Sequence, residues 1–82
     1  MKQYNINNVI INSYDAVCTS SAGNVCRRVS FQDENGKVYQ AKTARNSSAG
    51  YDIVNAYLLK KRVNIVYHVT KNNNLIIDFV NE

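Results

Sequence analysis

The stretch RRVSFQDENGKVYQAK, residues 27–42, decides how this chain folds. Two runs of alternating apolar and polar residues flank DENG at 33–36, and asparagine followed by glycine between such runs is a strong hairpin signal. We therefore expect one strand over residues 25–32 and another over residues 37–43 or 44. The register of this hairpin depends on the number of residues in its loop, and the side-chain pattern favours one of two possibilities.

A loop of two residues, Asn35 and Gly36, would place Phe31 opposite Gln40 and would mix core and charged side chains on each face. A three-residue loop, with Gly36 in the left-handed region as a bulge, places Phe31 opposite Tyr39 instead. Directly opposed residues share a face, so the other face then collects polar side chains. They are Arg28 and Ser30 on the first strand and Gln40 and Lys42 on the second. We therefore predict the three-residue loop.

The whole chain has the size of a single domain, residues 1–82. Its formal net charge of +4 is a mild bias toward anionic partners, although many small domains carry such a charge for solubility. No apolar run approaches the roughly 20 residues that span a bilayer, and the N-terminus lacks the apolar core of a secretion signal. We expect a cytoplasmic protein, or a secreted one if the chain is a mature product with an added methionine.

Three more strands and one helix are predicted from periodicity. Consecutive β-branched residues predict a first strand over 8–17, and alternation predicts a fourth strand over 62–70 and a fifth over 75–80. The residues expected to face inward are Val63, Ile65, Tyr67 and Val69 in the fourth strand and Leu75, Ile77 and Phe79 in the fifth. Ile76, Asp78 and Val80 are expected to face outward.

The helix is expected to begin near Ser47 or Ser48, either of which can cap it, with Asp52 in or near its first turn. Lys60 and Lys61 close it, which suits the negative C-terminal end of a helix. Its apolar stripe is expected to consist of Ile53, Val54, Tyr57 and Leu58.

The order strand, strand, strand, helix, strand, strand resembles that of the OB-fold, a five-stranded barrel that binds oligonucleotides or oligosaccharides. The segments VSFQDENGKVYQAKT and KRVNIVYHVTKNNNLIIDFV look like the second–third and fourth–fifth strand pairs of that family. We expect a mostly β protein, a small five-stranded OB-like barrel with one helix between strands three and four. The alternatives are another partly open barrel or a sheet with one helix on its face.

The resemblance implies a ligand site on the outer face of strands two and three, flanked by loops 19–24 and 71–74. The first hypothesis is single-stranded nucleic acid, with cations holding phosphates and aromatic rings stacking on bases. The residues assigned to that site are Arg28, Ser30, Gln40, Lys42, Arg45 and Lys71, and Lys60, Lys61 and Arg62 could extend the track. Tyr14 and His68 are the best outward aromatic candidates.

A second hypothesis is a glycan ligand, because the chain also resembles the B subunits of bacterial AB-type toxins. NSSAGYDIVNAYLLKKRVNIVYH is similar in character to their helix and following strand. That resemblance implies a homopentameric ring, for which Ile76 and Val80 could supply apolar contacts. The two cysteines, Cys18 and Cys26, are expected to be free thiols in a cytosolic protein, whereas in an exported protein they could bridge the base of a short loop.

A third hypothesis is a small phage or plasmid protein that binds a host protein. Catalysis is not expected, since no nucleophile elbow or phosphate-binding glycine loop is present. The cysteine spacing fits no zinc pattern, and we expect neither a metal site nor a cofactor.

Overall fold

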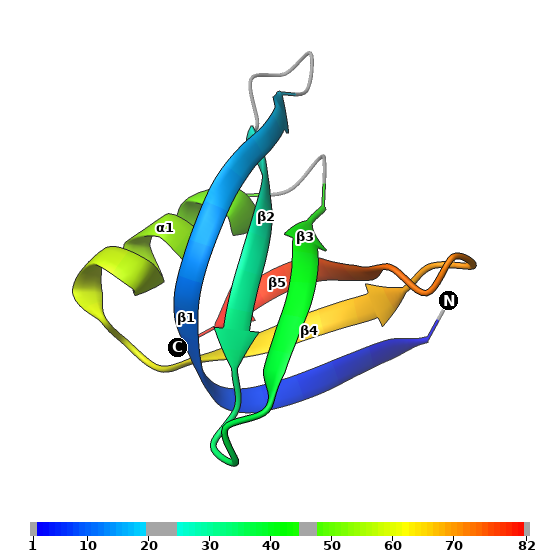
Figure 1. Ribbon diagram of the computed structural model, residues 1–82. Helices are drawn as coiled ribbons and strands as arrows, with labels where there is room; N and C mark the ends of the chain where they lie inside the picture. The colour runs from blue at the N-terminus through cyan, green and yellow to red at the C-terminus, as the bar shows by residue number, and fades with distance from the viewer. Residues whose placement is uncertain (1, 20–24, 45–47, 82) are drawn as a thin grey trace.

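The computed structural model describes residues 2–19, 25–44 and 48–81, which form a closed five-stranded barrel with one helix (Figure 1). The strands are β1 (Gln3–Thr19), β2 (Val25–Gln32), β3 (Val38–Thr43), β4 (Val63–Val69) and β5 (Leu75–Asn81), and the helix α1 (Ala49–Leu59) lies between β3 and β4. Around the barrel the strands follow the order β1-β2-β3-β5-β4. The expected architecture of an OB-like barrel with a helix between strands three and four is confirmed.

The β2–β3 hairpin has the predicted register. Phe31 pairs with Tyr39, and Arg28 pairs with Lys42. The Asp33 N–H donates to the Lys37 carbonyl at 3.0 Å, which leaves a loop of three residues. Gly36 closes that loop in the left-handed region at φ 85°, a conformation that glycine adopts without steric cost.

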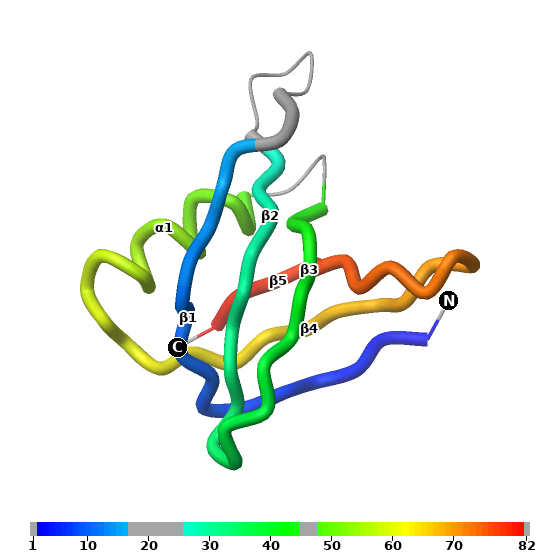
Figure 2. The backbone as a smooth tube through the Cα atoms, viewed as in Figure 1, coloured from blue at the N-terminus to red at the C-terminus, as the bar shows by residue number. Residues whose placement is uncertain are grey.

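Strand β1 is longer than the sequence predicted, because it begins at Gln3 and not at residue 8. Asn8 adopts a left-handed conformation, φ 55°, and the register with β4 shifts between Ile6 and Val9. The strand bends there, as Figure 2 shows. The first half of β1 pairs with β4 and its second half pairs with β2. Strand β1 therefore connects β4 to the β2–β3 hairpin.

The barrel interior is filled by inward side chains of all five strands and by one face of α1. The largest completely buried side chains are Phe31, Ile53, Ile65, Ile77, Val9 and Val29. Burying a side chain of this size stabilises the fold by about 1.5–3 kcal/mol. The helix therefore acts as a cover for one end of the barrel, and Ile53 is its deepest contact.

The expected inward stripe of α1 is wrong at two positions. Leu58 is 66% exposed and Tyr57 is 40% exposed, whereas Ala49, Gly50 and Ala56 are buried together with Ile53. Small residues on the buried face allow the helix backbone to approach the strand ends closely. Tyr57 and Leu58 are consequently turned away from the barrel, while Ile53 is completely buried.

The alternation in β5 also changes partway along the strand. Val66 pairs with Phe79 and Tyr67 pairs with Ile77, so Asp78 occupies a β-bulge. After the bulge the faces exchange. Phe79, expected inside, is 57% exposed, and Val80, expected outside, packs against the core.

Strand β4 follows its predicted alternation until its last residue. Val63 and Ile65 are buried, and Tyr67 packs against the core. Val69, expected to face inward, is 41% exposed because it lies at the end of the strand beyond the filled part of the barrel. Within the described parts of the chain, no helix combines the length and apolar character needed to cross a membrane.

Candidate ligand-binding face of the barrel

Four polar side chains lie together on the outer face of β2 and β3, as their spacing predicted. Arg28 and Lys42 are direct cross-strand partners, and so are Ser30 and Gln40. The Gln40 side-chain amide donates to the Ser30 hydroxyl at 3.3 Å. The hairpin register therefore produces two neighbouring cations beside a small hydrogen-bonded polar pair.

A hollow of about 340 Å³ adjoins this face where β3 and β5 separate. Among the described residues these strands pair only through Lys42 with Ile76 and Thr43 with Ile77. On the N-terminal side of Lys42, β3 diverges from β5. The β4–β5 turn forms the wall of the hollow opposite β3. The lining consists of Arg28, Gln40, Ala41 and Lys42 on one side and Asn73, Asn74 and Leu75 on the other. The volume is at the lower end of the range for small-molecule sites.

The hollow is electropositive and rich in side-chain amides. Of the residues that the structure describes, Arg28 and Lys42 are the charged ones that line it, and none of the lining residues is acidic. Gln40, Asn73 and Asn74 add amides, each of which has both a donor group and an acceptor oxygen. An anionic ligand with several hydroxyl groups fits this set of partners.

The remaining predicted site residues do not complete the hollow. Lys71 is exposed in the turn before β5 but does not line the hollow. Arg45 and loop residues 20–24 lie outside the described residues. Arg62 donates to the Asn8 carbonyl at 2.8 Å, so this end of the expected cationic track is engaged at the bend in β1.

The resemblance placed the loop 71–74 beside the ligand site, and Asn73 and Asn74 of that loop line the hollow, whereas Leu75 was not expected there. The asparagine run at 72–74 was a signal for the turn, and Asn73 adopts the left-handed conformation at φ 62°. Only the divergence of β3 from β5 makes the end of this turn a wall of the site.

No aromatic side chain lines the hollow among the described residues. Tyr14, expected to face outward, instead packs against Tyr57 at 5.3 Å between ring centroids, and the Arg27 guanidinium lies over its ring. Phe31 and Tyr39 stack at 5.1 Å within and beside the core. The rings that a stacked base would need are therefore engaged elsewhere.

Tyr4 and Tyr67 form a separate stacked pair at 5.4 Å, on β1 and β4. Burial raises the pKa of the Tyr67 hydroxyl, and the neighbouring Tyr39 and Tyr4 raise it further, while the charge of Lys37 opposes them. Tyr67 thus remains a neutral phenol at physiological pH. Tyr4 is 41% exposed, but neither ring reaches the lining of the hollow.

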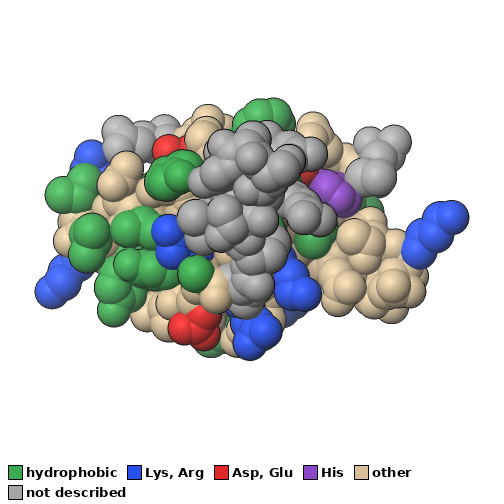
Figure 3. Space-filling view, turned by 90° about the horizontal axis from the view of Figure 1, so that it is seen from above, with side chains coloured by type: hydrophobic (Ala, Val, Ile, Leu, Met, Phe, Trp, Pro, Cys, Tyr) green, Lys and Arg blue, Asp and Glu red, His purple; other side chains and the backbone are tan. Residues whose placement is uncertain are grey.

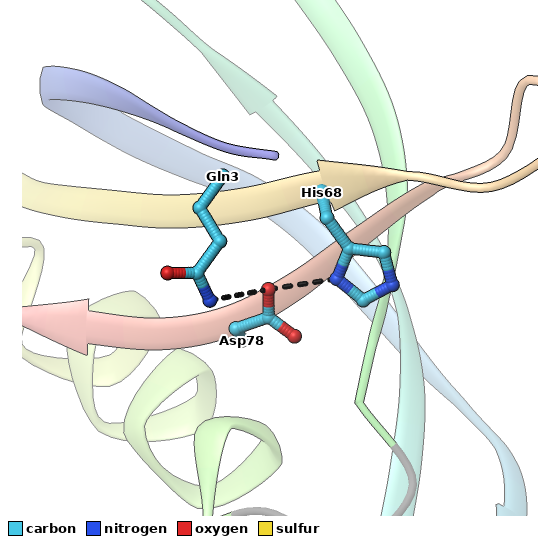
Figure 4. Close-up of polar contacts among 3 residues, drawn as sticks. All are labelled: Gln3, His68 and Asp78. Atoms are coloured by element: carbon cyan, nitrogen blue, oxygen red, sulfur yellow. Dashed lines mark hydrogen bonds and ion pairs between the residues drawn. The ribbon is translucent and has the colours of Figure 1, made fainter. Parts of the chain in front are cut away.

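His68 lies on the outer face of β4, where the bulge at Asp78 brings a carboxylate to it (Figure 4). His68 Nδ1 and Asp78 Oδ2 are 2.7 Å apart, and the side-chain amide of Gln3 donates to the same oxygen at 3.3 Å. The three residues join β1, β4 and β5. Since each of them is occupied with the others, we interpret this group as a structural link between strands.

Cys26 is buried and disulfide-bonded. The other cysteine of the chain, Cys18, is its Cα partner across the β1–β2 ladder. The expectation of free thiols is therefore wrong for Cys26. In the described segments no three histidine, cysteine or acidic residues gather as they would around a metal ion.

No protein-family model matches the chain, and neither a curated protein nor a solved structure matches it. The function is therefore inferred from the geometry of the β2–β3 face and the hollow beside it.

Proposed function

We propose that this protein is a non-enzymatic binding module that takes a carboxylate-bearing sugar in the hollow beside β2 and β3. The observation that supports this most directly is the lining, which combines Arg28 and Lys42 with three amide residues and, within the described parts of the chain, contains no acidic or aromatic residue. Oligosaccharide binding at the outer face of strands two and three is also what the resemblance to OB-like barrels implies.

The chemistry of the lining matches such a ligand group by group. The Arg28 guanidinium can bind a carboxylate through two parallel hydrogen bonds, and Lys42 beside it adds a second positive charge. The amides of Gln40, Asn73 and Asn74 can donate to and accept from ring hydroxyls. Hydrogen bonds to a charged group contribute about 1.5–3 kcal/mol each, against about 0.5–1.5 kcal/mol for neutral ones.

The disulfide at Cys26 supports the same proposal, because disulfides persist mainly in secreted and other extracytoplasmic proteins. Glycans are abundant ligands outside cells. Under this proposal the protein is exported and binds a glycan, which is also what its resemblance to the B subunits of AB-type toxins implies.

The test uses pairs of oligosaccharides that differ only in the presence of a carboxylate. We expect the acidic member of a pair to shift the backbone amide signals of Gln40, Lys42 and Asn74 in NMR titrations, and the neutral member to bind at least about tenfold more weakly. Arg28→Ala combined with Lys42→Ala should abolish the preference. Lys2→Ala combined with Lys37→Ala removes the same charge away from the hollow and should leave it intact.

If no acidic sugar of a broad panel shifts these signals, or if both double variants bind equally well, the assignment of the hollow is wrong. The folded state of each variant is checked by its dispersion of amide signals, so loss of binding is distinguished from unfolding.

Single-stranded nucleic acid is a second candidate, and the adjacency of Arg28 and Lys42 favours it because consecutive phosphates could bind both. Contact with about three phosphates would give a logarithmic salt dependence with a slope near −2. Among the described lining residues none is aromatic, which argues for weak binding without base stacking. Oligonucleotide affinity that is equal for the wild type and the Arg28→Ala, Lys42→Ala variant at low salt would exclude this candidate.

A further inference from the structure

The outward face of α1 is more apolar than expected for a helix face that is exposed to solvent. Leu58 is 66% exposed, Leu59 62% and Tyr51 47%. Asp52 is the one charged residue between Ala49 and Leu59. Figure 3 shows hydrophobic side chains gathered over the end of the molecule where α1 lies, with lysine or arginine side chains at the border.

Helix α1 has large apolar side chains on its solvent-facing side as well as on the side that contacts the barrel. The face toward the barrel consists of Ile53 with the small residues Ala49, Gly50 and Ala56, whereas Leu58, Leu59 and Tyr51 are exposed. Soluble monomers rarely leave a contiguous apolar patch of this kind uncovered, and such patches mark association sites. The exposed side chains of Tyr51, Leu58 and Leu59 therefore form a surface suited to packing against another protein molecule.

A small hollow of about 110 Å³ continues this patch between α1 and the barrel. Its apolar lining comes from Ala56 and Leu59 of the helix and from Val63 and Val80 of the strands. Asp52 and Lys61 lie at the same hollow and give it an edge of mixed charge. An incoming leucine side chain from another molecule has both a place to insert and polar groups around it.

The charges at the two ends of α1 indicate which molecule covers this face, namely a second copy of the same chain. Asp52 lies in the first turn, and Lys60 follows the last turn. If two copies of α1 pack antiparallel, Asp52 of one copy comes near Lys60 of the other at both ends, and the helix dipoles oppose each other favourably. An interface between identical patches must be self-complementary in this way.

We propose that the outward face of α1, consisting of Tyr51, Leu58 and Leu59 with Asp52 and Lys60 at its ends, is a self-association surface that packs antiparallel against the same face of a second copy of this chain. The surface is separate from the hollow beside β2 and β3, so the inference does not depend on the proposed sugar ligand.

The first experiment measures molar mass by light scattering and sedimentation over a range of concentrations. We expect the wild type to exceed the monomer mass reversibly, and Leu58→Glu or Leu59→Glu to weaken association at least about tenfold. Asn72→Glu adds the same charge at an exposed turn position and should associate like the wild type. A wild type that is monomeric at every concentration, or association unaffected by either leucine variant, overturns the inference.

A second experiment tests the antiparallel arrangement with two charge reversals, Asp52→Lys and Lys60→Asp. Each variant alone places like charges together at both ends of the pair and should associate more weakly than the wild type. An equimolar mixture restores opposite charges at both ends and should recover the associated mass. If the mixture associates no better than the separate variants, the antiparallel pairing is wrong. Circular dichroism and thermal melting establish that each variant is folded.

A measurement of sugar binding at the hollow beside β2 and β3 distinguishes this inference from the proposed function. A folded, monomeric Leu58→Glu variant should retain the affinity of the wild type for a monovalent acidic sugar, if that proposal holds. Failure of sugar binding with intact self-association would affect only the proposed function, and the reverse result would affect only the association surface.

Discussion

The side-chain amide of Asn8 donates a hydrogen bond to Glu34 Oε1 at 2.8 Å, which joins the bend in β1 to the loop of the β2–β3 hairpin. The backbone N–H of Asn8 donates to Asn64 Oδ1 at 3.1 Å, and its carbonyl accepts from Arg62. The bend that lets β1 pair with two different strands is therefore held by groups from β4, from the residue before β4 and from the hairpin loop.

Replacement of Asn8 should separate backbone strain from hydrogen bonding. Asn8→Ala places an alanine at φ 55° and removes the side-chain donor, so we expect a loss of about 1–2 kcal/mol in the free energy of unfolding. Asn8→Gly removes the donor without the strain and should cost less. Glu34→Ala removes only the exposed acceptor and should cost under about 1 kcal/mol. Urea denaturation measures all three, and equal losses for alanine and glycine would contradict the role of the left-handed conformation.

Gly36 tests the three-residue loop of the hairpin. A Cβ added at Gly36 would meet no atom within 4 Å, so Gly36→Ala introduces conformational strain without a clash. At φ 85° we expect a loss of about 1 kcal/mol in stability, and a smaller loss for Gly36→Asn because asparagine tolerates the left-handed region better. Thermal melting compares the two variants. An alanine variant as stable as the wild type would show that the loop adopts another turn.

Asp33 should make the hairpin sensitive to acid. Desolvation raises the pKa of its carboxyl, but hydrogen bonds from the backbone N–H groups of Lys37 and Asn35 and from the Tyr39 hydroxyl, together with the charge of Lys37, bring the net pKa below the ordinary 3.8. A carboxylate whose pKa is depressed by folding contributes stability above the unfolded-state pKa and loses it as pH falls through the folded-state pKa.

We therefore expect the melting temperature of the wild type to exceed that of Asp33→Asn between pH 5 and pH 7, with a difference that shrinks below about pH 4. Glu34→Gln serves as the control for loss of a negative charge from the same loop, because it leaves the hydrogen bonds to Asp33 in place. A constant difference between the wild type and Asp33→Asn down to pH 2 would contradict the depressed pKa.

Reduction of the disulfide should destabilise the β1–β2 end of the barrel. The Cys18-to-Cys26 loop is short, so the loss of the bond should cost about 2–3 kcal/mol, which in a domain of this size lowers the melting temperature by roughly 10–20 °C. A Cys18→Ser, Cys26→Ser double variant should melt at the temperature of the reduced wild type and should not respond to dithiothreitol. An unchanged melting temperature in reductant would contradict the bond.

The register of the β2–β3 hairpin could be predicted because it depends on local information. Glycine at 36 permits the left-handed loop residue, and alternation assigns Phe31 and Tyr39 to one face and Arg28 and Lys42 to the other. The polar half of the candidate site follows from this register alone. The order of elements also predicted the barrel, because five short strands avoid open edges most simply by closing.

Two other features depend on contacts between residues far apart in the sequence. The rotation of α1 is set by the space at the barrel end, where Ala56 fits close to the strands and Leu58 does not. The bulge at Asp78 depends on the pairing of β5 with β4, and it reverses the faces of the residues that follow. Periodicity within one segment contains no information about either contact.

The sequence by itself thus determined the hairpin, its charged face and the class of fold, since these depend on turn chemistry and on the twofold alternation of a strand. Only the tertiary structure decided that β3 and β5 separate after two pairs and leave a hollow against Asn73 and Asn74, and that the leucines of α1 face outward. The physical reason is that a cavity or an exposed patch results from how whole elements approach one another, and close packing settles that approach over the entire core at once.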